Sequence, residues 1–107
     1  MNNKDRKIIA VDFDGTIVED NYPHIGCIIP SVKSYLQGEK KYNNAYIILW
    51  TCRCGEKLEE AVNFCKKANI PIDRVNSNAP WILEDYKFEP RKIYANEIID
   101  DKNKIIR

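Results

Sequence analysis

Two pairs of acidic residues each follow a short run of apolar residues in this sequence. Asp12 and Asp14 follow the run Ile8–Val11, and Asp100 and Asp101 close a later apolar run. A carboxylate is costly to bury without a partner, and neighbouring carboxylates repel one another. Acids in these positions therefore indicate that a cation receives them.

The apolar runs are typical of buried strands, because they are short, rich in Ile and Val, and bounded by charged or turn residues. We expect strands at residues 7–12, 45–50, 72–75 and around 98–99. The spacing of apolar residues predicts a helix over 56–69, a weaker helix over 31–42 that Gly38 interrupts, and a helical turn within 81–85. Proline and glycine make residues 17–30 an irregular segment.

Strands that alternate with helices predict an α/β fold, with a mostly parallel, Rossmann-like sheet covered by helices on both faces. A chain of 107 residues accommodates one such three-layer domain, residues 1–107. Ligands of such sheets bind beyond the carboxyl ends of the strands. We therefore expect Asp12, Thr51 and Asp100, which each follow an apolar run, to meet at one edge.

The residue types at this edge suit phosphate chemistry. A hard divalent cation would relieve the repulsion between the carboxylates, and Mg²⁺ prefers oxygen ligands and water. The hydroxyl group of Thr51 can donate to a phosphoryl oxygen, and the ammonium group of Lys92 can offset its charge. Metal, hydroxyl and ammonium groups together outline a site for phosphoryl transfer.

The same residues resemble, in order, four signatures of the haloacid dehalogenase-like (HAD) hydrolases. The first signature, Asp-x-Asp-x-Thr, matches DFDGT at 12–16, and the second, a hydrophobic strand ending in Thr or Ser, matches IILWT at 47–51. Lys92 stands where the third-signature lysine is expected, with Arg91 as the alternative cation. The fourth, an apolar strand ending in two acids, matches IIDD at 98–101.

This resemblance implies the chemistry of a phosphatase. Asp12 would be the nucleophile that forms an aspartyl-phosphate, and Asp14 would be the general acid and base. The metal ligands of Mg²⁺ would be Asp12, Asp14 through its backbone carbonyl, Asp100 and Asp101. An Asp at the second position of the first signature favours phosphatase over dehalogenase activity.

Three further side chains would hold the phosphoryl oxygens in this interpretation. Thr51 and Lys92 correspond to the second and third signatures, and Lys92 also counts among the catalytic groups. Arg53 lies two residues after Thr51, which is similar to the Thr/Ser-x-Arg of polynucleotide phosphatases in the same superfamily. We therefore expect Arg53 to contribute to phosphate binding.

The intervals between the signatures leave no room for a cap domain. Between Thr16 and Thr51 there are 34 residues, and between Thr51 and Lys92 there are 40. A single βαβ unit takes roughly 30 residues. The stretch YPHIG, 22–26, is similar to one in small capless HAD-like proteins of bacteria and phages, and the role of its His24 stays open. An open site suits a large phosphorylated substrate, or a small one if a homo-oligomer closes it.

Composition excludes some partners. The net charge of +1 gives no indication of nucleic-acid binding, and no apolar run is long enough to span a membrane. The N-terminal residues lack the apolar stretch of a secretory signal, so we expect a cytoplasmic protein with its four cysteines reduced. A zinc site formed by His24, Cys27, Cys52 and Cys54 is less favoured, because their spacing matches no common zinc motif.

Two other functions use similar residues. A receiver-like signalling domain also combines acids, Mg²⁺, Thr and Lys, but its acidic pair lies near the N-terminus and its phospho-accepting Asp lies in mid-chain. Here the order differs, because Asp-x-Asp comes first and the double Asp comes near the end. A regulatory module that binds metal and phosphate without turnover is the third interpretation.

Overall fold

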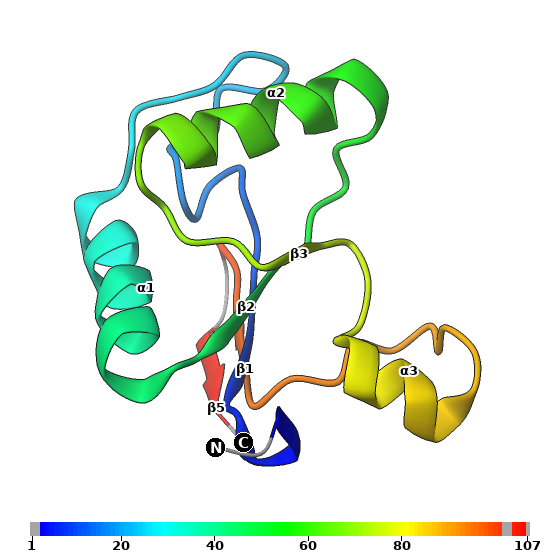
Figure 1. Ribbon diagram of the computed structural model, residues 1–107. Helices are drawn as coiled ribbons and strands as arrows, with labels where there is room; N and C mark the ends of the chain where they lie inside the picture. The colour runs from blue at the N-terminus through cyan, green and yellow to red at the C-terminus, as the bar shows by residue number, and fades with distance from the viewer. Residues whose placement is uncertain (1–2, 102–103, 107) are drawn as a thin grey trace.

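A five-stranded sheet forms the centre of the protein (Figure 1). The computed structural model describes residues 3–101 and 104–106. The strands are β1 (Ile8–Val11), β2 (Tyr46–Leu49), β3 (Arg74–Val75), β4 (Glu97–Ile99) and β5 (Lys104–Ile106). Their order in the sheet is β3-β2-β1-β4-β5, with β1 to β4 parallel and β5 antiparallel to β4.

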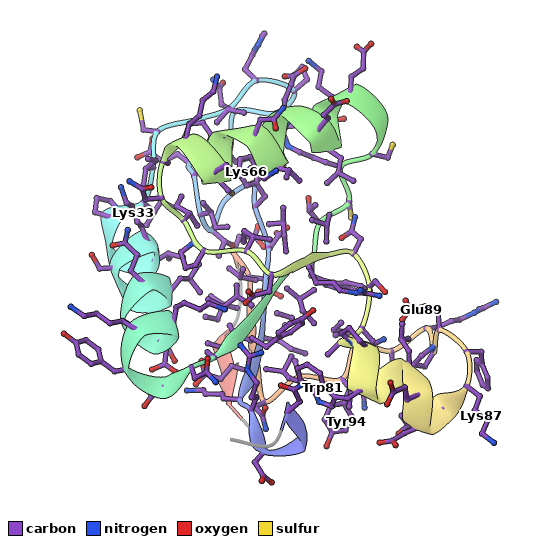
Figure 2. All side chains as sticks on the ribbon, in the orientation of Figure 1. Lys33, Lys66, Trp81, Lys87, Glu89 and Tyr94 are labelled. Atoms are coloured by element: carbon purple, nitrogen blue, oxygen red, sulfur yellow. The ribbon has the colours of Figure 1, made fainter. Side chains whose placement is uncertain are left out.

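Helices cover both faces of the sheet, as the alternating pattern predicts. They are α1 (Pro30–Asn43), α2 (Gly55–Lys67) and α3 (Pro80–Tyr86), and a short 3-10 helix spans Asn3–Asp5. Figure 1 shows α3 on the side of the sheet away from α1. In Figure 2, Trp81 and Tyr94 lie on the α3 side, whereas Lys33 and Lys66 lie on α1 and α2.

The two faces of β1 account for this arrangement, because successive side chains of a strand point to opposite faces. Ile9 and Val11 belong to the apolar cluster that also contains residues of α1 and α2. Ile8 and Ala10 belong to a second cluster with Trp81 and other residues near α3. All four residues of β1 are buried, which is why the strand reads as a continuous apolar run rather than an alternating one.

The weaker of the expected helices is longer than predicted. Helix α1 begins with Pro30 and continues through Gly38, which does not interrupt it as expected. Burial of Leu36 anchors the helix to the sheet and outweighs the modest helix propensity of a single glycine. The helix ends at Asn43, and its C-cap residue Asn44 has a left-handed backbone with φ 51°.

The remaining connections agree with the expected α/β domain. Within the described residues, each crossover between the parallel strands contains one helix, residues 12–29 form the expected irregular segment before α1, and no cap domain is inserted. The antiparallel strand β5 extends the sheet beyond the four expected strands. None of the described helices is long and apolar enough to cross a lipid bilayer.

Candidate active site

Asp12 and Asp100 lie side by side at the carboxyl edge of the sheet. Asp12 follows β1 and Asp100 follows β4, and these two strands are parallel neighbours. The backbone N–H of Asp12 donates to the carbonyl oxygen of Ile99 at 2.9 Å, so the ladder continues to the acids themselves. From β1 the chain proceeds to β2 and β3 on one side and returns to β4 on the other, which makes this position a topological switch point.

The carboxylate of Asp12 lies in a strongly anionic setting. It is half-buried, and its Oδ1 accepts a hydrogen bond of 2.8 Å from the backbone N–H of Phe13. Burial raises the pKa of Asp12, and the nearby charges of Asp101, Asp14 and Asp100 raise it further, although the Phe13 hydrogen bond opposes them. A cation bound beside Asp12 would offset both the burial of its charge and the repulsion from the neighbouring acids.

Asp14 is paired with Arg53. The guanidinium Nε donates to Oδ2 of Asp14 and Nη2 donates to Oδ1, each at 2.8 Å. The side chain of Arg53 is only 1% exposed, and that of Asp14 is 19% exposed. The hydrogen bond to Asp14 is the largest contribution that raises the pKa of Arg53. This bidentate pair fixes both the position and the orientation of the second acid of the first signature.

The placement of Arg53 differs from the phosphate-binding role that the sequence suggests. A guanidinium group has five N–H donors. Two bind Asp14, and the other contacts are with the carbonyl oxygens of Pro23 at 3.5 Å, Lys57 at 3.3 Å and His24 at 2.9 Å. Because the protein itself occupies these donors, Arg53 has none left for a phosphoryl oxygen. Its contacts make it the residue that positions Asp14.

The same contacts explain how the 22–24 segment is held over Arg53. The backbone carbonyls of Pro23 and His24 bind the guanidinium group, and its carbon lies 5.1 Å from the ring centroid of Tyr22 and 5.0 Å from that of Phe13. The imidazole of His24 is exposed, and the backbone of this residue, rather than its side chain, contacts the site.

Asp101 approaches the turn after Asp12 closely. A Cβ added to Gly15 would lie 2.9 Å from the Cβ of Asp101, and Gly15 has a left-handed backbone with φ 82°. Glycine is therefore required here both by the backbone and by the neighbouring side chain. Asp101 is exposed, and it influences the site through the charge that it places near Asp12.

Thr51 lies in the same recess as Asp12 and Asp100. Its Oγ1 accepts a hydrogen bond of 3.2 Å from the backbone N–H of Arg53, and its own N–H donates to Oδ1 of Asn76 at 2.8 Å. The recess has a volume of about 440 Å³. Its lining consists of Asp12, Trp50, Thr51, Cys52, Asn76, Ile93, Ile98, Ile99 and Asp100. Three of the expected site residues, from three strand ends, therefore share one depression.

Lys92 is not brought into this recess. Its side chain is exposed and lines a neighbouring pocket with Tyr86 and Pro90, and Ile93 forms a wall of both pockets. Arg91 is exposed as well. The fully buried Asn78 holds this segment, because its Nδ2 donates to the carbonyl oxygen of Lys92 at 3.3 Å and its Oδ1 accepts from the N–H of Tyr94 at 2.6 Å.

The oxygen donors at the edge fit a magnesium ion that has few protein ligands. Within the described part of the chain, no three His, Cys, Asp or Glu side chains are grouped to hold a metal ion, the suggested zinc ligands included. Mg²⁺ is usually bound through one or two carboxylates, with waters and substrate phosphates as its other ligands. Asp12 and Asp100 can supply these carboxylates. The carboxylate of Asp14 is committed to Arg53, so only its backbone carbonyl could contribute.

The cysteines do not form a second site in the described chain. All four are free thiols, with Cys27, Cys52 and Cys54 exposed. Cys65 lies on the apolar face of α2 and is 1% exposed, and burial raises the pKa of its thiol to about 11.

The fold and the site together define an α/β protein with an acidic recess at the carboxyl edge of a mostly parallel sheet. No family model and no curated protein matches the sequence. A solved structure of a conserved protein from Bacteroides thetaiotaomicron is similar, with 39% sequence identity and a TM-score of 0.79, over 92% of this chain and 78% of that chain. At this identity and coverage, the chain belongs to the same family as the Bacteroides protein.

Proposed function

We propose that this protein is a Mg²⁺-dependent phosphatase of the HAD type, which hydrolyses a phosphoric monoester through an aspartyl-phosphate on Asp12. The observation that carries the proposal is the convergence of Asp12, Asp100 and Thr51, from three separate strand ends, in one recess. Three such residues at a topological switch point are what phosphoryl transfer by a carboxylate requires.

In the first step, an oxygen of Asp12 attacks the phosphorus atom, and the bond from phosphorus to the leaving oxygen breaks. The hydrogen bond from Phe13 to Oδ1 fixes the rotation of the Asp12 carboxylate. The hydroxyl group of Thr51 accepts from the N–H of Arg53 and can donate its own hydrogen to a phosphoryl oxygen. Bound Mg²⁺ would supply positive charge to the phosphoryl oxygens and offset the repulsion from Asp12 and Asp100.

In the second step, water attacks the phosphorus atom of the aspartyl-phosphate, the bond from phosphorus to the Asp12 oxygen breaks, and inorganic phosphate leaves while the carboxylate of Asp12 is restored. Asp14 would be the general acid and base of the two steps, giving a proton to the leaving oxygen and then taking one from the attacking water. For this, one of its carboxylate oxygens has to leave Arg53. Lys92 would take part only after its side chain moves from the neighbouring pocket into this recess. Four free thiols suit a reducing compartment, and we propose that the protein is cytoplasmic.

The test is hydrolysis of 4-nitrophenyl phosphate with and without Mg²⁺. We expect turnover that EDTA abolishes and excess Mg²⁺ restores, and that Asp12→Asn loses. Asp85→Asn is the matched control, since Asp85 is an exposed acid of α3 that does not line the recess. A covalent phosphate on Asp12 should be detectable by mass spectrometry after an acid quench.

Two other outcomes would replace the proposal. A long-lived phosphate on Asp12, formed from acetyl phosphate without release, would favour a receiver-like domain. Binding of Mg²⁺ and inorganic phosphate without any turnover would favour the regulatory module. The order of the motifs, with Asp-x-Asp first and the double Asp near the end, and a second acid two residues after Asp12 favour turnover over both of these outcomes.

A further inference from the structure

The recess that contains Asp12 has a second, apolar half. Asp12, Thr51 and Asp100 supply its polar end, whereas Trp50, Ile93 and Ile98 supply an apolar wall on the α3 side of the sheet. Its volume of about 440 Å³ lies within the roughly 300–1,000 Å³ typical of small-molecule sites. A phosphoryl group bound at the polar end would leave the apolar half for the remainder of the substrate.

Trp50 is held firmly at this wall. It follows β2 directly, and its backbone N–H donates to the carbonyl oxygen of Val11 at 2.8 Å, so the backbone of Trp50 is fixed beside β1. Its side chain is half-buried and packs against the cluster that includes Ile48 and Ile93. An indole with one part packed and another open to a recess is an effective platform for a flat ring.

Asn76 adds a hydrogen-bonding group to the same recess. Its Oδ1 accepts from the N–H of Thr51 at 2.8 Å, which fixes the plane of the amide. None of the described residues accepts a hydrogen bond from its Nδ2, which therefore stays available as a donor at the lining of the recess. The lining of the recess thus includes an aromatic side chain and an amide that can donate a hydrogen bond.

We propose that the apolar half of this recess binds an aromatic ring of the substrate, so that the substrate class is a phosphomonoester that carries an aromatic ring. This inference rests on the proposed function and specifies its substrate. An aryl or benzylic group and a nucleobase share this chemistry. Trp50 contacts the face of the ring, and Asn76 donates to a heteroatom where the ring carries one.

The test compares benzyl phosphate with cyclohexylmethyl phosphate. Both release a primary alcohol, so the two substrates differ mainly in whether the ring is aromatic. We expect kcat/KM to be about tenfold higher for benzyl phosphate, within the range that stacking on an aromatic side chain provides. Equal kcat/KM for the two substrates would overturn the inference and leave the proposed function intact.

Trp50 variants assign the preference to a residue. Trp50→Leu should remove the preference for benzyl phosphate, and Trp50→Phe should retain most of it. Tyr42→Leu is the control, since Tyr42 is a 76% exposed aromatic residue of α1, on the opposite face of the sheet. If Trp50→Leu keeps the preference, the inference is wrong.

A binding measurement separates the inference from catalysis. The chain has two tryptophans, Trp50 and Trp81, and only Trp50 lines this recess. The non-hydrolysable 4-nitrobenzylphosphonate should quench the tryptophan fluorescence of the wild type with Mg²⁺ but leave that of Trp50→Phe almost unchanged. Quenching without hydrolysis of any substrate would refute the proposed function alone, and unchanged fluorescence in the wild type would refute the inference.

A panel of natural compounds distinguishes the two sources of the ring. Nucleoside monophosphates, phosphotyrosine and sugar phosphates should be assayed at equal concentration. Faster hydrolysis of nucleotides identifies a nucleobase, and faster hydrolysis of phosphotyrosine identifies an aryl group. Faster hydrolysis of sugar phosphates than of both would contradict the inference.

Discussion

The guanidinium group of Arg53 binds both carboxylate oxygens of Asp14, at 2.8 Å each. Arg53 belongs to the segment between β2 and α2, whereas Asp14 follows β1, so the pair links two strand ends across the edge of the sheet. The three backbone carbonyls that complete the shell of Arg53 hold its plane fixed. Asp14 is consequently oriented before any substrate arrives.

Loss of this pair should lower stability as well as activity. Removal of one partner of a buried ion pair leaves the other charge uncompensated and typically costs about 3–5 kcal/mol. We expect Arg53→Gln to lose close to this amount in the free energy of unfolding, measured by urea denaturation. Arg53→Lys should recover little, because an ammonium group cannot bind the carboxylate in a bidentate manner.

A double-mutant cycle provides the control for Arg53. In Asp14→Asn/Arg53→Gln no charge is left without its partner, so the double variant should be more stable than the sum of the two single losses predicts. Additive losses, or an Arg53→Lys variant as stable as the wild type, would show that the pair has no specific role.

The acids of the site could be predicted from sequence, but the role of Arg53 could not. Asp12, Thr51 and Asp100 each follow an apolar strand, and the geometry of parallel sheets brings such positions together. The partner of Arg53 depends on the path of residues 22–24 and on the rotamer of a long side chain. Neither has a periodic signal in the sequence.

Asp12 should destabilise the folded protein at neutral pH when no metal is present. Burial and the neighbouring acids raise its pKa above the ordinary value of about 3.9, so the folded state binds the proton more tightly than the unfolded state. The free energy of unfolding therefore falls as pH rises from the ordinary pKa of Asp towards the raised pKa of Asp12 in the folded protein. We expect Asp12→Asn, whose amide oxygen can still accept from Phe13, to be more stable than the wild type at pH 7 in EDTA.

Two conditions should reverse or remove this advantage. Well below about pH 3.9 Asp12 is protonated in both the folded and the unfolded state, so the two proteins should have nearly equal free energies of unfolding. In excess Mg²⁺ the wild type should gain more stability than Asp12→Asn, because only the wild type retains the full ligand set. A wild type that is more stable in EDTA at pH 7 would contradict the prediction.

Gly15 should tolerate no side chain, whereas Gly38 should. At Gly15, an alanine would combine a left-handed backbone of φ 82° with a Cβ 2.9 Å from that of Asp101. We expect Gly15→Ala to lose at least about 1 kcal/mol and to weaken Mg²⁺ binding, measured by calorimetry. At Gly38, within α1, no atom lies within 4 Å, so Gly38→Ala should gain about 0.5–1 kcal/mol. Equal effects of both substitutions would refute this explanation.

Parts of the fold that depend on contacts distant in the sequence are harder to predict from sequence than the central strands. Strand β5 is an edge strand whose pairing with β4 fixes its conformation, and its sequence has no alternating pattern. Similarly, Asn78 is fully buried because it binds Glu89 and the backbone of Lys92 and Tyr94. A single asparagine in a polar connection has no pattern that distinguishes it from an exposed turn residue.

Tyr35 should make the stability of the protein sensitive to alkaline pH. Its hydroxyl donates to Oε1 of the buried Glu97 at 2.5 Å, and Lys7 binds the other oxygen of Glu97 at 2.7 Å. Burial, together with the hydrogen bond and charge of Glu97, raises the pKa of Tyr35 to about 12. The stabilisation is therefore complete below the ordinary tyrosine pKa of about 10 and is lost as pH rises towards 12.

Tyr35→Phe tests this directly by urea denaturation across pH. At pH 7 the variant should be less stable than the wild type by about 1.5–3 kcal/mol, since Glu97 loses a hydrogen bond to a charged group. Between pH 10 and 12 the two stabilities should converge, because only the wild type retains the ionisable hydroxyl at this position. Tyr42→Phe, in the same helix but 76% exposed, should follow the wild type throughout. A difference that stays constant up to pH 12 would show that the Tyr35 hydroxyl does not titrate with the fold.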